Sequence, residues 1–411
     1  MSDHPLIVAG LDLGTYAVKC VIGLRQEDGT VDILGTGSSP SRGFQNGAVY
    51  EADEAVKSIR AAVDEADLMA GTAIEEVFIS VSGRNFHSFQ SHGMARISDG
   101  TVGREDILEA ISMARCVKLP AEMEILHVVP QDYIIDAQTN IPRPMGMPGV
   151  RLEVHAHCVA GHMPSLLALE EICERANLSV VDVIMPSLAQ AEAILTTQAR
   201  DMGVVLVDVG GDTTEIAVFD GGAIQHHALL PVGGNHVTHD IKDCLNTPTV
   251  EAEHLKQLHG CALADMIGAD EVVEVPGVGG RRPRTIKRRV LCDIIEARVG
   301  EILRLLKGEL DQIGYVDGLP GGLVLTGGAA SLLGIVELAE HVMRMPAAKG
   351  EPQNLSGLVD VVRSSRYATG TGLVLCGVNQ KPILWFTSRQ IQAEPKGMRR
   401  FFRFWGARKN P

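Results

Sequence analysis

Two stretches of the chain share one pattern of apolar and polar positions: an apolar strand, a turn rich in glycine, and a second apolar strand. The first stretch covers residues 6–23 and the second covers residues 204–219. In each, the first strand ends near an aspartate, Asp12 or Asp208, which glycine and threonine follow. Apolar runs around a tight turn predict β-hairpins. Because the same unit occurs twice, we expect a duplicated fold with two facing halves.

Strand and helix patterns alternate after both hairpins. The predicted strands are residues 31–37, 77–82, 126–135 and 226–231. The predicted helices are residues 51–69, 104–117, 187–195, 237–244, 250–259, 291–306 and 332–342. A third strand with a Gly-rich turn is predicted at 323–330, and a closely packed helix of small residues at 367–375. This alternation favours an α/β architecture.

The pattern changes between residues 84 and 160, where a helix and a strand precede a loop at 141–150 that is rich in proline and glycine. We expect a small α+β domain inserted into the first half. Residues 379–397 have little periodicity and contain two prolines, which predicts a linker. It leads to a last segment, residues 398–411.

Composition narrows the class of protein. The chain has 411 residues, which favours two or more domains, and 45% of them are apolar, enough for a sizeable core. Its net charge of −14 disfavours nucleic acid as a partner. The eight cysteines include no pair with two residues between them, so we expect no zinc site and reduced thiols in a cytosol. Neither a signal peptide nor an apolar run of membrane-spanning length is expected.

The repeated Asp-Gly-Thr pattern suits a nucleoside triphosphate with Mg²⁺. Glycine lets backbone N–H groups approach phosphate oxygens, and threonine adds a hydroxyl donor. Asp12 and Asp208 could hold the ion directly or through water, while Gly327 and Gly328 would leave room for the nucleoside. One such turn alone is more typical of an ordinary tight hairpin. Two turns and the Gly-Gly strand end together favour the phosphate site.

The chain resembles the actin, Hsp70 and sugar-kinase superfamily and, more narrowly, the FtsA family of bacterial cell-division proteins. The resemblance extends over essentially the whole chain. The segments that carry it are SPSRGF (39–44), LHVVPQ (126–131), PGVRLE (148–153), HGCAL (259–263), VPGVGGR (275–281) and LTGGA (325–329). It implies a duplicated actin-like (ribonuclease H-like) α/β fold with a small inserted α+β domain.

On this basis the chain is divided into seven parts. Residues 1–83 begin the first actin-like domain, 84–160 form the inserted subdomain (1C-like), and 161–200 return to the first domain. Residues 201–366 form the second actin-like domain, with the nucleotide-flanking helices and the partner surface. The remaining parts are a closing helix of the first domain (367–378), the linker (379–397) and an amphipathic helix (398–411).

The resemblance also implies which residues bind ATP and Mg²⁺. The first phosphate loop is Asp12, Gly14, Thr15, Tyr16 and Lys19; the second is Asp208, Gly210, Gly211, Asp212, Thr213 and Thr214. The remaining members are Gly233, Gly234 and Asn235, then Glu253 and Lys256 beside the adenosine, and Gly327, Gly328 and Ala329. Asp12 and Asp208 are the metal candidates. As alternatives, Lys19 could be a solvated strand lysine, and Glu253 with Lys256 a surface ion pair.

One residue of the second loop departs from the family pattern. Asp212 stands where relatives commonly have a third glycine, and its charge should weaken nucleotide binding or slow turnover unless it points away or ligates the metal. Hydrolysis also needs a residue that positions water. Glu192 is a weak candidate, with a plain surface glutamate as the alternative. The family resemblance implies that ATP is bound and supports polymerisation, with weak or uncertain hydrolysis.

The last segment forms an amphipathic helix on a helical wheel. One face carries Met398, Phe401, Phe402 and Trp405, and the other carries Arg399, Arg400 and Arg403. This arrangement is typical of a helix that lies in an anionic membrane surface. The alternatives are a helix docked on its own domain and a basic tail for nucleic acid. FtsA proteins carry such a terminal helix, so the resemblance also favours the membrane.

A basic run at residues 279–289 precedes the helix predicted at 291–306. By itself it predicts only a solvated loop and a helix start. The resemblance implies that this surface binds the C-terminal peptide of FtsZ, with Arg284 and Arg298 as the contacts, because arginine pairs bidentately with carboxylates.

The resemblance further implies a function and a place in the cell. We expect an ATP-binding protein that forms actin-like filaments and anchors the FtsZ ring at the division site. It would lie on the cytoplasmic face of the inner membrane and recruit later division proteins through the inserted subdomain. The alternative is a sugar or acetate kinase of the same superfamily, which would have no use for a membrane-binding tail. An Hsp70-type chaperone is disfavoured because too little chain follows residue 375 for a substrate domain.

Overall fold

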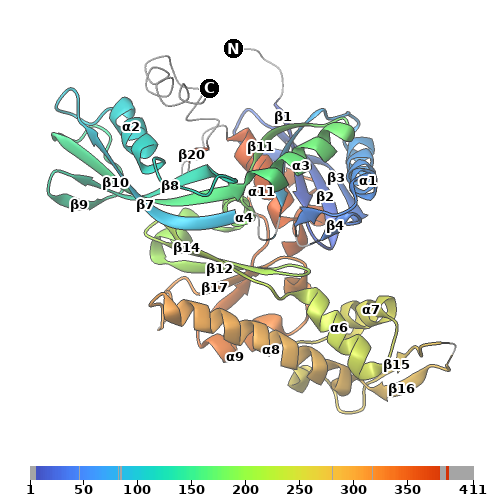
Figure 1. The fold of residues 1–411 in the computed structure, drawn as a ribbon. Coiled ribbons are helices and arrows are strands. Elements are labelled where there is room, and N and C mark those ends of the chain that lie inside the picture. The colour runs from blue at the N-terminus through green and yellow to red at the C-terminus, as the bar shows by residue number, and fades with distance from the viewer. Residues whose placement is uncertain are drawn as a thin grey trace. The chain divides into compact units, whose positions relative to one another are not determined.

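The computed structural model describes residues 6–45, 47–81, 83, 86–279, 281–316, 318–379 and 386–387 (Figure 1). These residues divide into two compact units. The first contains the described residues up to Ser88 and those from Gly161 to residue 379, and the second contains Phe89–Ala160 with residues 386–387. The predicted membrane helix at 398–411 lies outside the described residues.

The first sheet of the larger unit has the strand order β11-β6-β1-β2-β3-β19. Its strands are β1 (Ile7–Leu13), β2 (Ala17–Arg25), β3 (Val31–Pro40), β6 (Glu76–Val81), β11 (Ser179–Val183) and β19 (Leu355–Gly357). Strands β1, β2 and β3 pair antiparallel, whereas β6 joins β1 in parallel. The hairpin predicted at 6–23 is therefore confirmed.

Helices cover both faces of this sheet at close range. Helices α1 (Ala52–Ala70) and α11 (Ala368–Val378) lie against the strands, α3 (Met163–Arg175) lies against α1 and β11, and α4 (Pro186–Ile194) packs on α11. A Cβ atom added to Gly37 would lie 1.9 Å from the Ala62 carbonyl oxygen of α1, and one added to Gly10 would lie 2.5 Å from the Gly370 carbonyl oxygen of α11. Glycine at these strand positions therefore lets the helix backbones pack directly against the sheet.

The second sheet of the larger unit repeats the arrangement. Its order is β14-β13-β12-β17-β18, with β12 (Val204–Val209), β13 (Thr214–Asp220), β14 (Ala223–Leu230), β17 (Leu323–Thr326) and β18 (Ala347–Lys349). An antiparallel run of three strands again has a parallel neighbour beside its first strand. Strands β17-β12-β13-β14 thus match β6-β1-β2-β3, which confirms the predicted duplication.

The helices of this half include α6 (Gly234–Leu245), α7 (Thr249–His259), α8 (Arg288–Gln312) and α9 (Ile335–Met343). A core of buried Val, Leu and Ile side chains joins α8 and α9 to the sheet; it includes Val207, Leu303, Leu325 and Leu338. Shorter elements in the larger unit are β4 (Phe44–Gln45), β5 (Ala48–Val49), α5 (Thr197–Met202), α10 (Val359–Val362) and the 3₁₀ turns at Ala264–Met266, Ala329–Ser331 and Ser365–Tyr367.

One local prediction was wrong. Residues 284–287, expected in a loop, form strand β16 (Arg284–Lys287), which pairs antiparallel with β15 (Val272–Val275). Alternate residues of β15 are buried, so the ribbon packs one face on the domain and exposes the other. The charged, four-residue β16 carries too little apolar periodicity to indicate a strand.

The smaller unit consists of a sheet with one helix. The strand order is β20-β8-β10-β7, and β9 pairs with β8. The elements are β7 (Phe86–Arg96), α2 (Arg104–Ala114), β8 (Met123–Ile135), β9 (Gln138–Ile141), β10 (Arg151–His162) and β20 (Phe386–Thr387). Strand β20 lies in the segment for which the sequence predicted a linker. Burial lowers the pKa of His127 in β8 to about 4.

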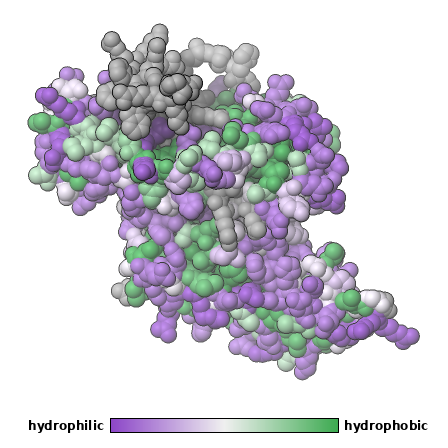
Figure 2. Space-filling view, viewed as in Figure 1, coloured by the Kyte–Doolittle hydropathy of each residue, from purple (hydrophilic) through white to green (hydrophobic). Residues whose placement is uncertain are grey.

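Among the described residues, the cysteines form no disulfide bond. All eight cysteines lie in the described residues and are free thiols. No helix among the described residues has both the length and the apolar content needed to span a bilayer. Figure 2 shows polar residues over most of the visible face, with apolar residues in separate small groups.

Candidate functional site

The first phosphate loop connects β1 to β2. Asp12 and Lys19 occupy paired positions of this hairpin, and the Lys19 Nζ atom lies 3.3 Å from the Asp12 carboxylate. Asp12 is 6% exposed. A buried carboxylate is stable when a cation pairs with it. The first loop therefore brings its own positive charge.

The second loop connects β12 to β13, and Gly210 donates its backbone N–H to the Thr213 carbonyl at 2.9 Å. The Asp208 carboxylate accepts a hydrogen bond from the Gln190 side-chain amide of α4. Burial raises the pKa of Asp208 to about 7, and the nearby negative charges of Glu215 and Asp12 act in the same direction. Near neutral pH this carboxyl group is therefore only partly ionised.

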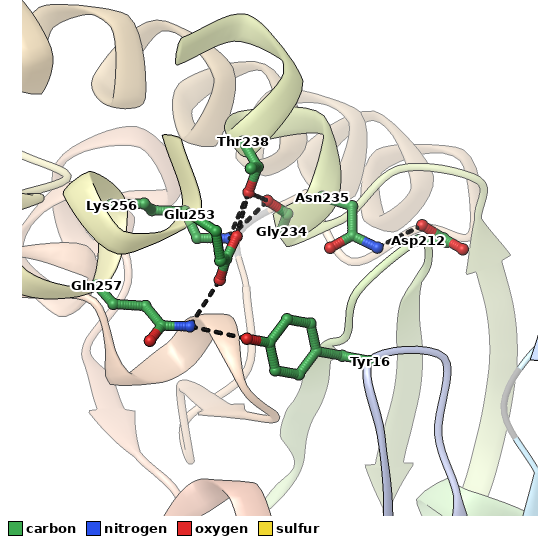
Figure 3. Close-up of polar contacts among 8 residues, drawn as sticks. All are labelled: Tyr16, Asp212, Gly234, Asn235, Thr238, Glu253, Lys256 and Gln257. Carbon is green, nitrogen blue, oxygen red and sulfur yellow. Dashed lines mark hydrogen bonds and ion pairs between the residues drawn. The ribbon is translucent and has the colours of Figure 1, made fainter. Parts of the chain in front are cut away.

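The second loop is tied to the start of α6. Gly234 and Asn235 donate backbone N–H groups to the carbonyls of Gly210 and Gly211 at 2.9 and 2.7 Å. A Cβ atom on Gly233 would lie 2.7 Å from both of those carbonyl oxygens, so only glycine fits. The Asn235 amide also donates to the Asp212 carboxylate at 2.8 Å (Figure 3). This contact directs the Asp212 charge toward α6.

Gly327, which directly follows β17, must be glycine for two reasons. Gly327 has a φ of +86°, a left-handed conformation that other residues rarely adopt. A Cβ atom there would lie 2.0 Å from the Asp208 carboxylate. By contrast, a Cβ on Gly328 would meet no atom within 4 Å. The backbone at this turn therefore lies against Asp208 and leaves open space beside Gly328.

Glu253 and Lys256 of α7 belong to a hydrogen-bonded network that Figure 3 shows. The Lys256 ammonium contacts Glu253 at 2.7 Å, the Thr238 hydroxyl at 2.8 Å and the Gly234 carbonyl at 3.0 Å. Burial lowers the pKa of Lys256, and Glu253 partly offsets this effect. Burial raises the pKa of Glu253, but the Lys256 charge and the hydrogen bonds to it outweigh burial and hold the value below normal. The side chains of Glu253 and Lys256 are thus mostly buried, and they do not form the surface ion pair that was the alternative.

These elements enclose a cavity of about 440 Å³. Of the predicted nucleotide residues, sixteen line it: Asp12, Gly14, Thr15, Tyr16, Lys19, Asp208, Gly210, Gly211, Thr213, Gly234, Asn235, Glu253, Lys256, Gly327, Gly328 and Ala329. Three do not: Asp212, Thr214 and Gly233. Thr214 is buried and donates its hydroxyl to the Val232 carbonyl at 2.8 Å. Loops from both halves of the larger unit therefore meet around one cavity.

The donor set beside this cavity suits a magnesium ion that is shared with phosphates. The described residues include no group of three or more His, Cys, Asp or Glu side chains arranged to hold a metal ion. Mg²⁺ commonly uses only one or two protein carboxylates and completes its shell with water and phosphate oxygens. Asp208 fits this role because its contacting partner is a neutral amide. The carbonyl oxygen of Gln190 is buried without a hydrogen-bond partner among the described residues.

Sequence comparison shows long, close matches to one family. The chain is 42% identical over 375 residues to the cell division protein FtsA of Pseudomonas aeruginosa, with 91% of this chain and 90% of that protein covered. It is 39% identical over 383 residues to FtsA of Escherichia coli K12, covering 92% and 91%, and 35% identical over 376 residues to FtsA of Bacillus subtilis, covering 91% and 84%. The chain belongs to the FtsA family of cell division proteins.

Two family models match separate ranges of this chain. The model of cell division protein FtsA matches residues 205–372, and the model of the SHS2 domain inserted in FtsA matches residues 83–160. The latter range contains most of the smaller unit. The inserted α+β domain expected from the sequence is thereby confirmed.

Solved structures with the same fold support the actin-like architecture. A chain of the PilM-PilN type IV pilus biogenesis complex matches with a TM-score of 0.66 and 17% identity, covering 91% of this chain and 99% of that chain. MreB5 of Spiroplasma citri bound to ADP matches with a TM-score of 0.55 and 12% identity, covering 90% and 95%. At these identities the likeness concerns the fold alone, and the predicted duplicated actin-like fold is confirmed.

The structure places the remaining candidate residues of this FtsA-family chain away from the cavity lining. Glu192 on α4 pairs with Arg200 at 3.0 Å. Arg284 on β16 donates to the Leu245 carbonyl at the end of α6. Arg298 on α8 binds Asp240 bidentately at 2.6 and 2.9 Å and also contacts Glu301. Its charge is therefore already paired within the chain.

Several lining or supporting residues had no signal in the sequence. Gln257, Arg288, Arg366, Tyr367 and Thr369 line the cavity. Gln190 supports it, since its amide joins Asp208 to the Thr369 hydroxyl at 2.9 Å. Tyr367 and Thr369 lie in the segment that the sequence singled out for its small residues, and Arg288 lies in the basic run at 279–289. The others carry no Gly-rich or repeated pattern that marks them.

Proposed function

We propose that this FtsA-family protein binds Mg·ATP in the cavity between its two hairpin loops. The observation that carries the proposal is the pair of matching Asp-Gly-Thr loops, one from each half, on a single cavity of about 440 Å³. Glycines at the close approaches keep side chains out of the space that phosphates would need. The related folds of MreB5 from Spiroplasma citri were solved with ADP and with AMPPNP, which supports a nucleotide as the ligand class.

In this proposal the two loops contact the phosphates in different ways. Lys19 supplies a fixed positive charge, and Thr15 and Thr213 supply hydroxyl and backbone donors at the cavity wall. Mg²⁺ would be held mainly by Asp208, with Asp12 near it, and when bound would neutralise phosphate charge. Glu253 and Lys256 would flank the adenosine next to the space beside Gly328. Because Glu192 is paired with Arg200 and does not line the cavity, no hydrolytic role is assigned to it here.

We further propose that the bound protein assembles into actin-like filaments that link the FtsZ ring to the cytoplasmic face of the cell membrane at the division site. Family membership supports this, as does the amphipathic pattern of residues 398–405. The inserted domain would contact later division proteins. Family membership also sets aside the kinase alternative, and no observation at the cavity favours it.

Arg284 and Arg298 differ in how accessible their guanidinium groups are to the FtsZ peptide. Arg284 is exposed on β16, near other exposed cations of the same ribbon, so a carboxylate of the peptide could reach it. Arg298 would have to exchange Asp240 or Glu301 for the peptide. We therefore expect Arg284→Glu to weaken binding of an FtsZ tail peptide in fluorescence anisotropy. The control is Arg363→Glu, at an exposed arginine that directly follows α10.

Equilibrium dialysis of the purified protein with ATP tests the nucleotide proposal. We expect saturable, Mg²⁺-dependent binding to one site, and its absence would overturn the proposal.

Flotation with anionic liposomes tests the anchor. Trp405→Glu should remain with the soluble protein, whereas the control Leu68→Glu, at an exposed apolar position of α1, should float with the lipid. If Trp405→Glu floats like the wild type, the terminal helix is not the anchor.

A further inference from the structure

At the rim of the cavity, a side-chain hydrogen bond joins the two halves of the larger unit. Tyr16 lies in the loop between β1 and β2, and Gln257 lies on α7, 241 residues further along the chain. The Gln257 amide donates to the Tyr16 hydroxyl at 3.0 Å, as Figure 3 shows. Both residues are exposed and both line the cavity. Their contact therefore lies where the cavity meets solvent.

The Gln257 side of this contact is held in place. The same amide nitrogen donates to Glu253 at 2.7 Å, and Glu253 is in turn bound by Lys256 and Thr238. An amide NH₂ group has two N–H donors, so Glu253 and Tyr16 use one each. The network orients the Gln257 amide toward the first loop.

The Tyr16 side is less restrained. Its side chain is 53% exposed. Among the described residues, Gln257 is the one hydrogen-bond partner found for its hydroxyl. Its backbone carbonyl accepts a hydrogen bond from the Ser41 N–H at 3.1 Å, so the loop backbone is anchored while about half of the side chain is exposed to solvent. A side chain of this kind can swing away without disturbing the phosphate loop.

We propose that Tyr16 and Gln257 form a latch over the cavity, which must open for a nucleotide to enter or leave. This inference rests on the nucleotide binding proposed above. The contact joins two cavity-lining residues to each other and not to a ligand, so the latch delays both entry and exit. A residue that contacts the ligand would delay exit alone. One exposed, neutral hydrogen bond changes an opening equilibrium by roughly two- to tenfold. That is the expected size of the effect on the rates.

Stopped-flow fluorescence with a fluorescent ATP analogue and Mg²⁺ tests the latch on the full-length protein. The variants are Tyr16→Phe, which removes only the hydroxyl, Gln257→Leu, and the double variant. Matched controls are Tyr50→Phe and Gln198→Leu, two exposed positions that do not line the cavity. Association and dissociation rates should rise together by roughly two- to tenfold in each single variant. The double variant should show no further increase, because either change removes the whole contact.

Thermal unfolding of the same variants without nucleotide gives an independent readout. The shifts in melting temperature of the two single variants should not add in the double variant, as expected for two residues that share one contact. Unchanged rates, additive effects, or a rise in dissociation alone would overturn the latch. If the wild-type protein fails to bind the analogue, the proposed function fails, and additive shifts in melting temperature would separately reject the latch.

Discussion

The two hairpin loops have nearly the same backbone and opposite electrostatics. In the first, the cross-strand partner of the aspartate is Lys19; in the second, the corresponding partner of Asp208 is Glu215. Lys19 pairs with Asp12, whereas Glu215 raises the pKa of Asp208 beyond the effect of burial. The two loops therefore share the same strand register, but only the first has its own cation. The second loop is the one that needs a cation from outside, which is why we assign Mg²⁺ mainly to Asp208.

The largest effect should follow from removing the Asp208 carboxylate. Asp208→Asn keeps the shape but cannot hold a cation, so we expect the Mg²⁺-dependent part of ATP binding to be lost. Truncating one partner of a buried charge pair costs about 2–5 kcal/mol, or roughly thirtyfold and more in affinity. Isothermal titration with ATP, with and without Mg²⁺, measures it. Asp270→Asn, at an exposed position, is the control. Wild-type affinity in Asp208→Asn would contradict the assignment.

The next largest effect should come from the first loop. Lys19→Met removes the ammonium while keeping most of the side-chain length, and it leaves Asp12 without its cation. A hydrogen bond to a charged group contributes about 1.5–3 kcal/mol, so ATP affinity should fall roughly tenfold to a hundredfold. The same titration measures this, with exposed Lys242→Met as control. If ATP binding by Lys19→Met no longer depends on Mg²⁺, the first loop holds the metal ion, and the assignment of Mg²⁺ to Asp208 in the second loop is wrong.

The raised pKa of Asp208 predicts a pH effect on the nucleotide-free protein. Its folded pKa is about 7 and its unfolded pKa is near 4. The group's contribution to the free energy of unfolding is therefore fully present below pH 4 and is lost as the pH rises through 7. The side chain of Asp208→Asn cannot ionise. The melting temperature of the variant minus that of the wild type should therefore increase as the pH rises from 5 to 8. Calorimetry on both proteins measures the difference.

Glu215 provides a second test of that pH effect. Glu215→Gln removes the negative charge opposite Asp208, so the carboxyl should ionise at lower pH. The melting-temperature difference between Asp208→Asn and wild type should then be smaller in a Glu215→Gln background. A difference that is constant across pH in both backgrounds would mean that Asp208 is ionised throughout.

The smallest effect should come from Asp212. An electrostatic argument alone predicts tighter ATP binding when this charge is removed. The structure instead bonds the carboxylate to Asn235, so Asp212→Ala loosens the connection between the second loop and α6. We expect ATP affinity to fall by roughly two- to tenfold, the worth of one hydrogen bond. Asn235→Ala should match it, and the double variant should add little. Tighter binding in Asp212→Ala would favour simple charge repulsion.

Prediction from sequence succeeded where the signal was local. Apolar runs and glycine turns indicated both hairpins and Asp12, Asp208, Gly327 and Gly328. Other residues that line the cavity, such as Glu253 and Lys256, came from the family resemblance. It missed β16, two of whose four residues are charged. It also missed the existing partners of Arg298, because Asp240 lies on a different helix and is 58 residues away in the chain.

The sequence by itself determined the duplicated hairpins, the positions of Asp12 and Asp208, and membership of the FtsA family. These depend on the order of residues along short segments, which fixes strand, turn and glycine placement. Only the tertiary structure decided which side chains meet around the cavity. Gln190 reaches Asp208 from α4, and Gln257 reaches Tyr16 from α7. The physical reason is that burial and the charges of distant neighbours set the state of a carboxyl group, and those neighbours come together only when the halves pack.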